Sequence, residues 1–287
     1  MEPAAQTAPA ETAWSVRCPV CGTEYAVEGP EGRVAACTFC KDPLDARQIA
    51  RVAARAMSGG WAAMFVDRIY FPVTTLGPGE RVVVWTCGCT KRCPGCANPE
   101  LWETRPEAAI EPARLAAVLN DLAGRTGAHR ITFTGGDPPG QAPALASVPA
   151  ATRSAFDDIL IYTGYTFGEL TAMPKLPKGL LPLPSSPQPS SGGLPNEGSA
   201  GAAPSAHPED APLIDVLIDG PYVEAENDGV CALRGSTNQR VIVLNPALET
   251  LYHEEMQKPR SVQNAVFDGR AISIGIHGRP QTTREKE

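Results

Sequence analysis

Runs of apolar residues mark the strands that the chain is expected to form. Each run is five to seven residues long, rich in β-branched and aromatic side chains, and bounded by polar or turn-forming residues. These runs predict strands at 81–86 (RVVVWT), 130–134 (RITFT), 158–163 (DILIYT), 213–219 (LIDVLID) and 239–244 (QRVIVL).

Helical spacing separates these runs. In 111–123 apolar residues return every three or four positions, with Pro112 near the start and Gly124 at the end, so the pattern predicts an amphipathic helix. A second helix is expected near 149–156. Strands that alternate with helices predict an α/β fold in which the strands are parallel and the helices pack outside them.

The two ends of the chain carry different patterns. Apolar residues at helical spacing in 45–60, ending at Gly59 and Gly60, predict a helix that links two modules. Near the other end, VQNAVFDGRAISIGI is typical of a β-hairpin that turns at Asp268 and Gly269. The final residues are expected to be frayed.

Composition separates ordered from disordered segments. The 29 prolines of the chain are unevenly spread, and ten of them fall in 174–212. That segment lacks the apolar density that would offset its ordering entropy, so we expect a disordered insert within the domain. The Ala-, Pro- and Thr-rich residues 1–13 are expected to form a disordered tail.

Charge and hydropathy bound the class of protein. A net charge of −7 argues against a nucleic-acid or anionic-membrane binder, because such proteins need a basic surface. The N-terminus lacks the basic and apolar regions of a signal peptide, and no run approaches the roughly 20 apolar residues of a membrane span. We therefore expect a cytoplasmic protein. In that reducing compartment, nine clustered cysteines indicate metal or redox chemistry rather than disulfides.

The first cysteine group has the spacing of a small structural metal site. It reads C-x2-C-x15-C-x2-C and consists of Cys18, Cys21, Cys37 and Cys40. Paired thiolates of this kind fix a module too small to have a core, and zinc suits such a site better than iron. We predict a zinc ribbon over 14–44, with a rubredoxin-like iron site as the alternative.

The second cysteine group follows directly after the strand predicted at 81–86. Cys89, Cys93 and Cys96 form C-x3-C-x2-C, and thiolates spaced so closely favour an iron–sulfur cluster or zinc. Three ligands on a four-iron cube would leave one iron open to a substrate. Cys87 could act as a fourth ligand, but we expect it to be dispensable, and we expect Cys231 to be a small packed residue.

Several further motifs give this second group a family context. The chain resembles radical S-adenosylmethionine (SAM) enzymes, specifically the activating proteins of anaerobic ribonucleoside-triphosphate reductase, over about 68–173 and 213–246. The motifs that carry the resemblance, in chain order, are GPGERVVVWTCGCTKRCPGCANPELW, FTGGDPPGQ, YTGYTFGEL, IDVLIDGPYVE and RGSTNQRVIVL.

The resemblance implies a fold and a set of site residues. The fold would be a partial (β/α) barrel of the radical SAM type, with Cys89, Cys93 and Cys96 holding a 4Fe-4S cluster. SAM would bind to the open iron and along the ends of two strands. The residues implied for SAM binding are Gly135, Gly136, Asp137, Pro138, Tyr162, Thr163 and Gly164. Two further groups are equally well explained as turns or as contacts to SAM or substrate: Asp219, Gly220 and Pro221, and Gly235, Ser236, Asn238 and Gln239.

The resemblance also implies a reaction. The reduced cluster would cleave SAM to a 5′-deoxyadenosyl radical, which takes a hydrogen atom from a glycine of a partner enzyme, such as an anaerobic ribonucleotide reductase. A flavodoxin- or ferredoxin-like protein would donate the electron, and no protein base or nucleophile is needed. Two alternatives remain, a radical SAM enzyme that modifies a peptide or small molecule, and a metal-bearing interaction module without turnover.

The predicted organisation follows from these patterns. In chain order the segments are a disordered tail (1–13), a zinc ribbon (14–44), a linker helix (45–60), the first part of a radical SAM core (61–173), a disordered insert (174–212), the second part of the core (213–250), and a C-terminal hairpin with its tail (251–287).

Overall fold

A computed structural model describes residues 63–174, 176–177, 179–182, 212–267 and 270–276, together with four short N-terminal strands. Strand β1 (Trp14–Arg17) pairs with β2 (Glu24–Val27), and β3 (Arg33–Val34) pairs with β4 (Leu44–Asp45), both antiparallel.

These strand pairs fall in the segment predicted to be a ribbon. The predicted ligands Cys18, Cys21, Cys37 and Cys40 lie outside the described residues, as do the tail 1–13, the linker helix 45–60 except for the end of β4, and residues 183–211 of the insert. The zinc ribbon therefore stays a prediction.

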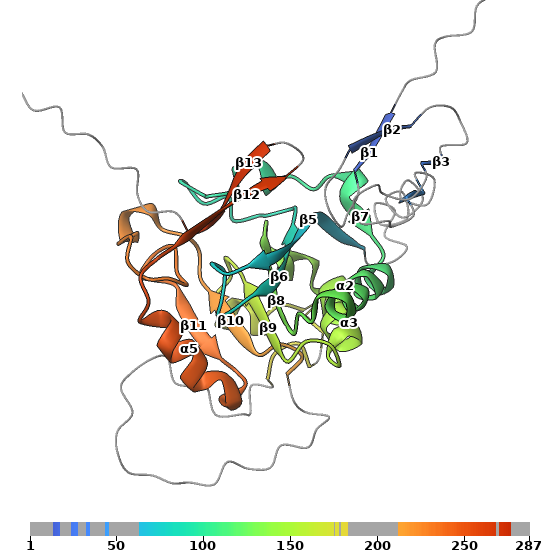
Figure 1. Cartoon of the computed structure of the whole chain (residues 1–287). Helices are drawn as coiled ribbons and strands as arrows, with labels where there is room; N and C mark the ends of the chain where they lie inside the picture. The colour runs from blue at the N-terminus through green and yellow to red at the C-terminus, as the bar shows by residue number, and fades with distance from the viewer. Residues whose placement is uncertain are drawn as a thin grey trace, which may run out of the picture.

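The main domain is built on a seven-stranded sheet (Figure 1), ordered β11-β10-β9-β8-β6-β5-β7. Its strands are β5 (Met64–Val73), β6 (Arg81–Thr86), β7 (Ala109–Ile110), β8 (Arg130–Gly135), β9 (Asp158–Tyr162), β10 (Val216–Asp219) and β11 (Arg240–Val243). Strands β6, β8, β9 and β10 are parallel, whereas β5, β7 and β11 join antiparallel. The α/β prediction is confirmed at this level, and β7 and β11 end the sheet in the part of the chain that the structure describes.

Strand β5 was missed by the sequence reasoning because its pattern is irregular. It contains Asp67, Arg68 and Pro72, and its register against β6 shifts twice. Asp67 is nevertheless buried, because it forms ion pairs with Arg68 and Arg105. A buried carboxylate of this kind hides a strand from any search for alternating apolar residues.

Two helices cover one face of the sheet. Helix α2 (Pro112–Thr126) confirms the predicted amphipathic helix, but it ends three residues later than expected. The residue that terminates it is Gly127, at φ 73°, whereas Gly124 lies inside the helix. A glycine stops a helix where it adopts the left-handed conformation, and Gly124 does not.

Helix α3 (Ala142–Thr152) begins seven residues before the predicted start at 149 and ends before 156. It includes Pro149 one turn before its end. The predicted position near 149–156 is therefore displaced toward the C-terminus, and Pro149 lies inside the helix rather than at its start. Two helices were not predicted, α4 (Phe167–Thr171) and α5 (Glu249–Met256). The short 3₁₀ segments are η1 (Pro99–Leu101), η2 (Pro106–Ala108), η3 (Pro138–Gln141), η5 (Glu224–Glu226) and η6 (Pro246–Leu248).

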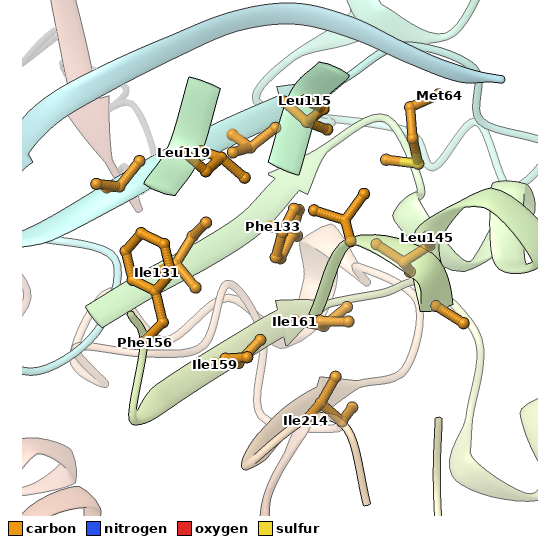
Figure 2. Close-up of a cluster of buried hydrophobic side chains, with 14 of the residues drawn as sticks. Met64, Leu115, Leu119, Ile131, Phe133, Leu145, Phe156, Ile159, Ile161 and Ile214 are labelled. Carbon is orange, nitrogen blue, oxygen red and sulfur yellow. The ribbon is translucent and has the colours of Figure 1, made fainter. Parts of the chain in front are cut away.

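Side chains alternate between the two faces of the sheet. On the face covered by α2 and α3, Ile131 and Phe133 of β8 pack with Leu115, Leu119 and Leu145 (Figure 2). The opposite face carries the other set of strand residues. Part of it packs against the C-terminal hairpin and part against Tyr252 of α5, which lies beside β10 and β11 (Figure 1).

The C-terminal hairpin is present as predicted. Strand β12 (Val262–Phe267) pairs with β13 (Arg270–Gly275), with Phe267 opposite Arg270, whereas the predicted turn residues Asp268 and Gly269 lie outside the described residues. The Thr75 hydroxyl donates to the Ile274 carbonyl at 3.0 Å. The hairpin is thereby attached to the segment that follows β5.

The insert begins later than predicted. Leu180 and Leu181 fall within 174–212 but are buried in the main core, and the Leu213 N–H donates to the Gly179 carbonyl at 2.7 Å. The chain therefore stays packed through these leucines. Among the described residues, every helix is too short or too polar to cross a bilayer.

Candidate metal centre and its rim

Every predicted site motif of the core lies at one edge of the sheet. The cysteine loop follows β6, Gly135 and Gly136 end β8, Tyr162 ends β9, and Asp219 ends β10. Because these four strands are parallel, their carboxyl ends meet at a single edge, which is where open α/β sheets bind ligands. Sequence motifs up to 130 residues apart are thus brought to one rim.

The cysteine loop folds back on the segment that follows it. The Gly88 N–H donates to the Leu101 carbonyl at 2.8 Å, and the Cys89 N–H donates to the Trp102 carbonyl at 2.9 Å. Farther along, the Cys96 N–H donates to the Cys93 carbonyl at 3.1 Å. These backbone bonds hold the start of the loop against residues 101–102 and close a turn between Cys93 and Cys96.

The three thiols are free, partly exposed and close enough to interact. Burial raises the pKa of Cys93, the Tyr222 N–H opposes that rise, and the neighbouring Cys89 and Cys96 add to it. The Asn98 N–H donates to the Cys96 sulfur at 3.4 Å. Backbone donors of this kind stabilise thiolates, the form that binds metal.

The spacing of the donors bears on which metal group fits. In the part of the chain that the structure describes, no three His, Cys, Asp or Glu side chains converge as they would around one metal ion. A single zinc ion needs all of its sulfur ligands at about 2.3 Å. A four-iron cluster binds each thiolate through a different iron, so the thiols need not converge on a point. Three thiolates on one loop could each bind a different iron of such a cluster.

Cys87 lies apart from this group. It is fully buried beside Trp85 and Leu101, and burial raises the pKa of its thiol although Arg105 opposes that rise. These surroundings support the prediction that Cys87 is not a ligand. The prediction for Cys231 is confirmed, because Cys231 is buried and its sulfur accepts a hydrogen bond from Arg234.

The glycine pair packs against the start of the cysteine loop. A Cβ atom on Gly135 would lie 2.5 Å from the Thr86 carbonyl oxygen, and one on Gly136 would lie 2.5 Å from that of Gly88. The Gly136 N–H donates to Thr86 at 2.7 Å, and the Asp137 N–H donates to Gly88 at 2.9 Å. Contact between two backbones therefore already requires glycine at both positions.

Asp137 presents an unpaired carboxylate oxygen at the rim. The side chain is buried, its Oδ1 accepts a hydrogen bond from the Thr163 hydroxyl at 2.8 Å, and its Oδ2 has no partner. Burial raises the pKa of Asp137 to about 7, although Thr163, the nearby Gly164 N–H and Lys91 oppose the rise. A buried oxygen without a donor is suited to a ligand that brings one, such as an ammonium group.

Residues 162–164 form the next part of the rim. The Thr163 N–H donates to the Ile218 carbonyl at 2.9 Å, and the Thr163 hydroxyl accepts from the Tyr165 N–H at 3.1 Å. Tyr162 points to the face opposite α2 and α3, where its buried hydroxyl lacks a partner and burial raises its pKa. Thr163 and Gly164 therefore line the rim beside Asp137, whereas Tyr162 packs beneath it.

Side-chain hydrogen bonds and an ion pair join the motif IDVLIDGPYVE to the motif RGSTNQRVIVL. The Gln239 side chain accepts from the Gly235 N–H at 2.8 Å and donates to the Gly220 carbonyl at 2.9 Å. Asp219 forms an ion pair with Arg240. Gln239 is therefore a structural residue here. Asn238 differs, because its amide nitrogen donates to Pro221 while its buried oxygen has no partner.

Comparison with known proteins agrees with this arrangement. A family profile described as "4Fe-4S single cluster domain" matches residues 75–180. The anaerobic ribonucleoside-triphosphate reductase-activating protein of Enterobacteria phage T4 is 30% identical over 117 residues, which cover 39% of this chain and 74% of the relative. The chain belongs to this activating-protein family. Relatives in Escherichia coli K12 (29% over 178 residues, 60% of this chain, 94% of the relative) and Pasteurella multocida (28% over 176 residues, 59% and 92%) carry the same name.

Membership confirms the resemblance drawn from the motifs. As a member of the activating-protein family, the chain is an activating enzyme with an iron–sulfur domain. The matched residues 75–180 include the cysteine loop, the glycine pair and residues 162–164. The ribbon segment and the C-terminal hairpin lie outside the matched residues.

Sequence reasoning missed residues that brace the site of this activating protein. Gln141 donates to the Cys87 carbonyl at 3.0 Å and accepts from the Phe65 N–H at 2.6 Å, so it joins β5 to the base of the cysteine loop. Lys91 and Glu169 form an ion pair across the rim. All three residues stood within the quoted motifs, but a motif does not say which of its side chains bind a ligand and which hold the backbone.

Proposed function

We propose that this protein activates a glycyl-radical enzyme, specifically an anaerobic ribonucleoside-triphosphate reductase, by radical SAM chemistry. The observation that carries the proposal is the juxtaposition of three partly exposed thiols with the unpaired, buried Asp137 oxygen on one rim. The names of the relatives support the choice of partner.

Cys89, Cys93 and Cys96 would hold three irons of a 4Fe-4S cluster as thiolates. The Tyr222 N–H opposes the rise that burial causes in the pKa of Cys93, and the Asn98 N–H donates to the Cys96 sulfur. A cluster with SAM at its fourth iron supplies reductive cleavage of the sulfonium and hence removal of a hydrogen atom from glycine. Because Cys87 is buried, residues 87–96 would provide three thiols rather than four, which would leave that iron for SAM.

Asp137 would orient SAM. Its Oδ2 would accept a hydrogen bond from the ammonium group of the methionyl part, while the Thr163 hydroxyl holds Oδ1 in place. Pro138 and Tyr162 would act through position, because both side chains pack beside or beneath the rim. The fold would be a partial (β/α) barrel whose inner face carries Tyr162. The four N-terminal cysteines would bind one structural zinc ion.

Anaerobic reconstitution tests the proposal. With iron, sulfide, dithionite and SAM, the protein should form methionine and 5′-deoxyadenosine. Adding the reductase encoded in the same genome should then yield the doublet of a glycyl radical by electron paramagnetic resonance. SAM cleavage without this signal would point to a different hydrogen donor. A bound cluster that never cleaves SAM would refute the enzymatic proposal.

A further inference from the structure

The residues between Cys89 and Cys93 reach across to the loop that joins β9 to α4. The Thr90 and Tyr165 hydroxyl oxygens are 2.8 Å apart, and Lys91 Nζ lies 2.9 Å from Glu169 Oε1. The Lys91 ammonium group also lies 4.2 Å from the centroid of the Tyr165 ring, within the range of a cation–π contact. A hydroxyl bond and a ring contact thus join the cysteine loop to the β9–α4 loop, and an ion pair joins it to α4.

The receiving carboxylate is itself fixed. Glu169 Oε2 accepts from the Thr166 N–H at 2.7 Å as part of the capping box of α4, which leaves Oε1 for Lys91. Hydrogen bonding from the Thr166 backbone, with Lys91 adding, lowers the pKa of Glu169 to about 2. An exposed pair of this kind is usually weak, but here one partner is held in place by a helix cap.

The stem of Lys91 occupies the space beside Gly164. A Cβ atom on Gly164 would lie 2.9 Å from Lys91 Cγ, so a larger residue there would displace the lysine. Gly164 follows Thr163, whose hydroxyl donates to Asp137. The contacts therefore run from the loop that carries the thiols, through Lys91, to the rim that carries the unpaired oxygen.

We propose that Lys91 is a positioning residue that fixes Cys89 and Cys93 relative to the rim formed by Asp137, Thr163 and Gly164. The proposal deepens the proposed function and rests on it only where a bound cluster is concerned. Lys91 touches neither the reacting atoms nor a thiol directly, and it acts through the loop that contains it.

The ion pair of Lys91 and Glu169, here called the clamp, would also act through its charges on a cluster bound at the loop. Reduction adds negative charge, and a nearby cation favours the reduced state while a nearby anion disfavours it. In the intact pair the two charges largely offset each other. Lys91→Met leaves the carboxylate alone, and Glu169→Gln leaves the ammonium alone. The two variants should therefore shift the reduction potential in opposite directions.

The first test uses the metal-free full-length protein and measures maleimide labelling of each cysteine by peptide-resolved mass spectrometry. Lys91→Met and Glu169→Gln should label Cys89 and Cys93 several-fold faster than the wild type, because the loop is released. Lys91→Arg, which keeps the charge and can stack on Tyr165, should restore the slow rate. Equal labelling rates in wild type, Lys91→Met and Glu169→Gln would overturn the proposal.

Two controls separate the clamp from general loosening. Glutamine at 169 can still close a capping box, so Glu169→Gln removes the charge and keeps the cap. Thr166→Ala removes the hydroxyl of the capping box and keeps the charge of Glu169. It should lower thermal stability without speeding the labelling. Asp121→Asn breaks an ion pair of similar length, 2.7 Å, on the exposed side of α2, and should change neither quantity.

The second test titrates the reconstituted proteins by electron paramagnetic resonance. The reduction potential of Lys91→Met should fall, that of Glu169→Gln should rise, and the double variant should return toward the wild type. Shifts in the same direction, or no shifts, would overturn the proposal although the wild type holds a cluster. If the wild type holds no cluster, the proposed function fails, and the labelling experiment alone decides the role of Lys91.

Discussion

At the scale of single residues, the chemistry of the rim depends on buried groups that have a shifted pKa or a polar atom without a hydrogen-bond partner. Asp137 is the clearest case, since its carboxyl group is buried with only one oxygen bonded. The residue was quoted within a motif, yet neither its burial nor its unpaired oxygen could be read from the motif. Both depend on Thr163, which lies 26 positions away and meets Asp137 only because β8 and β9 are parallel neighbours.

The raised pKa of Asp137 predicts how stability changes with pH. The folded state binds the proton up to about pH 7, whereas the unfolded chain releases it near 3.8. The folded state therefore holds more protons between these values, and its contribution to stability is lost as pH rises through that window. The loss is at most about 4 kcal/mol, from about 1.4 kcal/mol per pKa unit.

Urea unfolding of metal-free wild type and Asp137→Asn at pH 4 to 8 checks this. The stability of the wild type relative to the variant should fall as pH rises to about 7 and then level off. The asparagine variant cancels contributions from other titrating groups, because these are common to both proteins. A difference that does not change with pH would show that Asp137 is ionised throughout.

The cysteines predict a second contrast between single residues. Cys93→Ala should lose the iron–sulfur absorbance after anaerobic reconstitution, because two thiols remain on the loop. Cys87→Ala should keep both the absorbance and SAM cleavage, because that thiol is buried among apolar residues. Iron per chain and visible spectra measure the outcome. A Cys87→Ala protein that folds but binds no cluster would refute the ligand assignment.

At the scale of the elements, the effect of a glycine-to-alanine substitution on stability depends on the atoms that surround the added methyl group. Gly136→Ala would place a Cβ atom 2.5 Å from the Gly88 carbonyl oxygen, so the junction of β8 with the cysteine loop would have to separate. We expect a loss of roughly 1–3 kcal/mol, as for other overpacked sites. Gly124→Ala meets nothing within 4 Å inside α2 and should gain about 1 kcal/mol from helix propensity.

The two alanine variants make a matched pair for thermal or urea unfolding. They add the same methyl group, so opposite signs would trace to their surroundings. Gly136→Ala should also reduce iron retention, because the Asp137 N–H bond to Gly88 holds the base of the loop. Equal and small effects on stability would mean that the junction of β8 with the cysteine loop can shift to admit the methyl group without lowering the free energy of unfolding.

At the scale of the whole molecule, the sequence predicted the elements that have a periodic apolar pattern and missed the elements and contacts that do not. The core strands β6, β8, β9, β10 and β11, the helix α2 and the hairpin followed from periodicity. Strand β5 was missed because a buried ion pair breaks its pattern, and the antiparallel ends of the sheet depend on pairing over long distances. The three thiols and the rim were predicted as motifs. Lys91, Glu169 and Gln141 were missed because their roles exist only once separate loops meet.

The same distinction applies to Arg81, a charged residue at the start of a predicted strand that is fully buried. Its guanidinium group bonds the Asp158 carboxylate at 2.6 and 3.0 Å and the Thr132 hydroxyl at 2.7 Å, and the Tyr252 hydroxyl donates to Asp158 at 2.8 Å. These bonds join β6, β8, β9 and α5. Burial acts to lower the pKa of Arg81, but the charges and hydrogen bonds around it raise the pKa overall.

Removing one partner would leave the other charge buried and uncompensated. Asp158→Asn should therefore lower the free energy of unfolding by about 3–5 kcal/mol, whereas Asp121→Asn, in an exposed pair, should lower it by no more than about 1 kcal/mol. Tyr252→Phe removes a single bond to the carboxylate and should fall between them. Urea unfolding at constant pH measures all three. If Asp158→Asn behaved like Asp121→Asn, water would have to reach Arg81, and the four elements would not be joined through a dry ion pair.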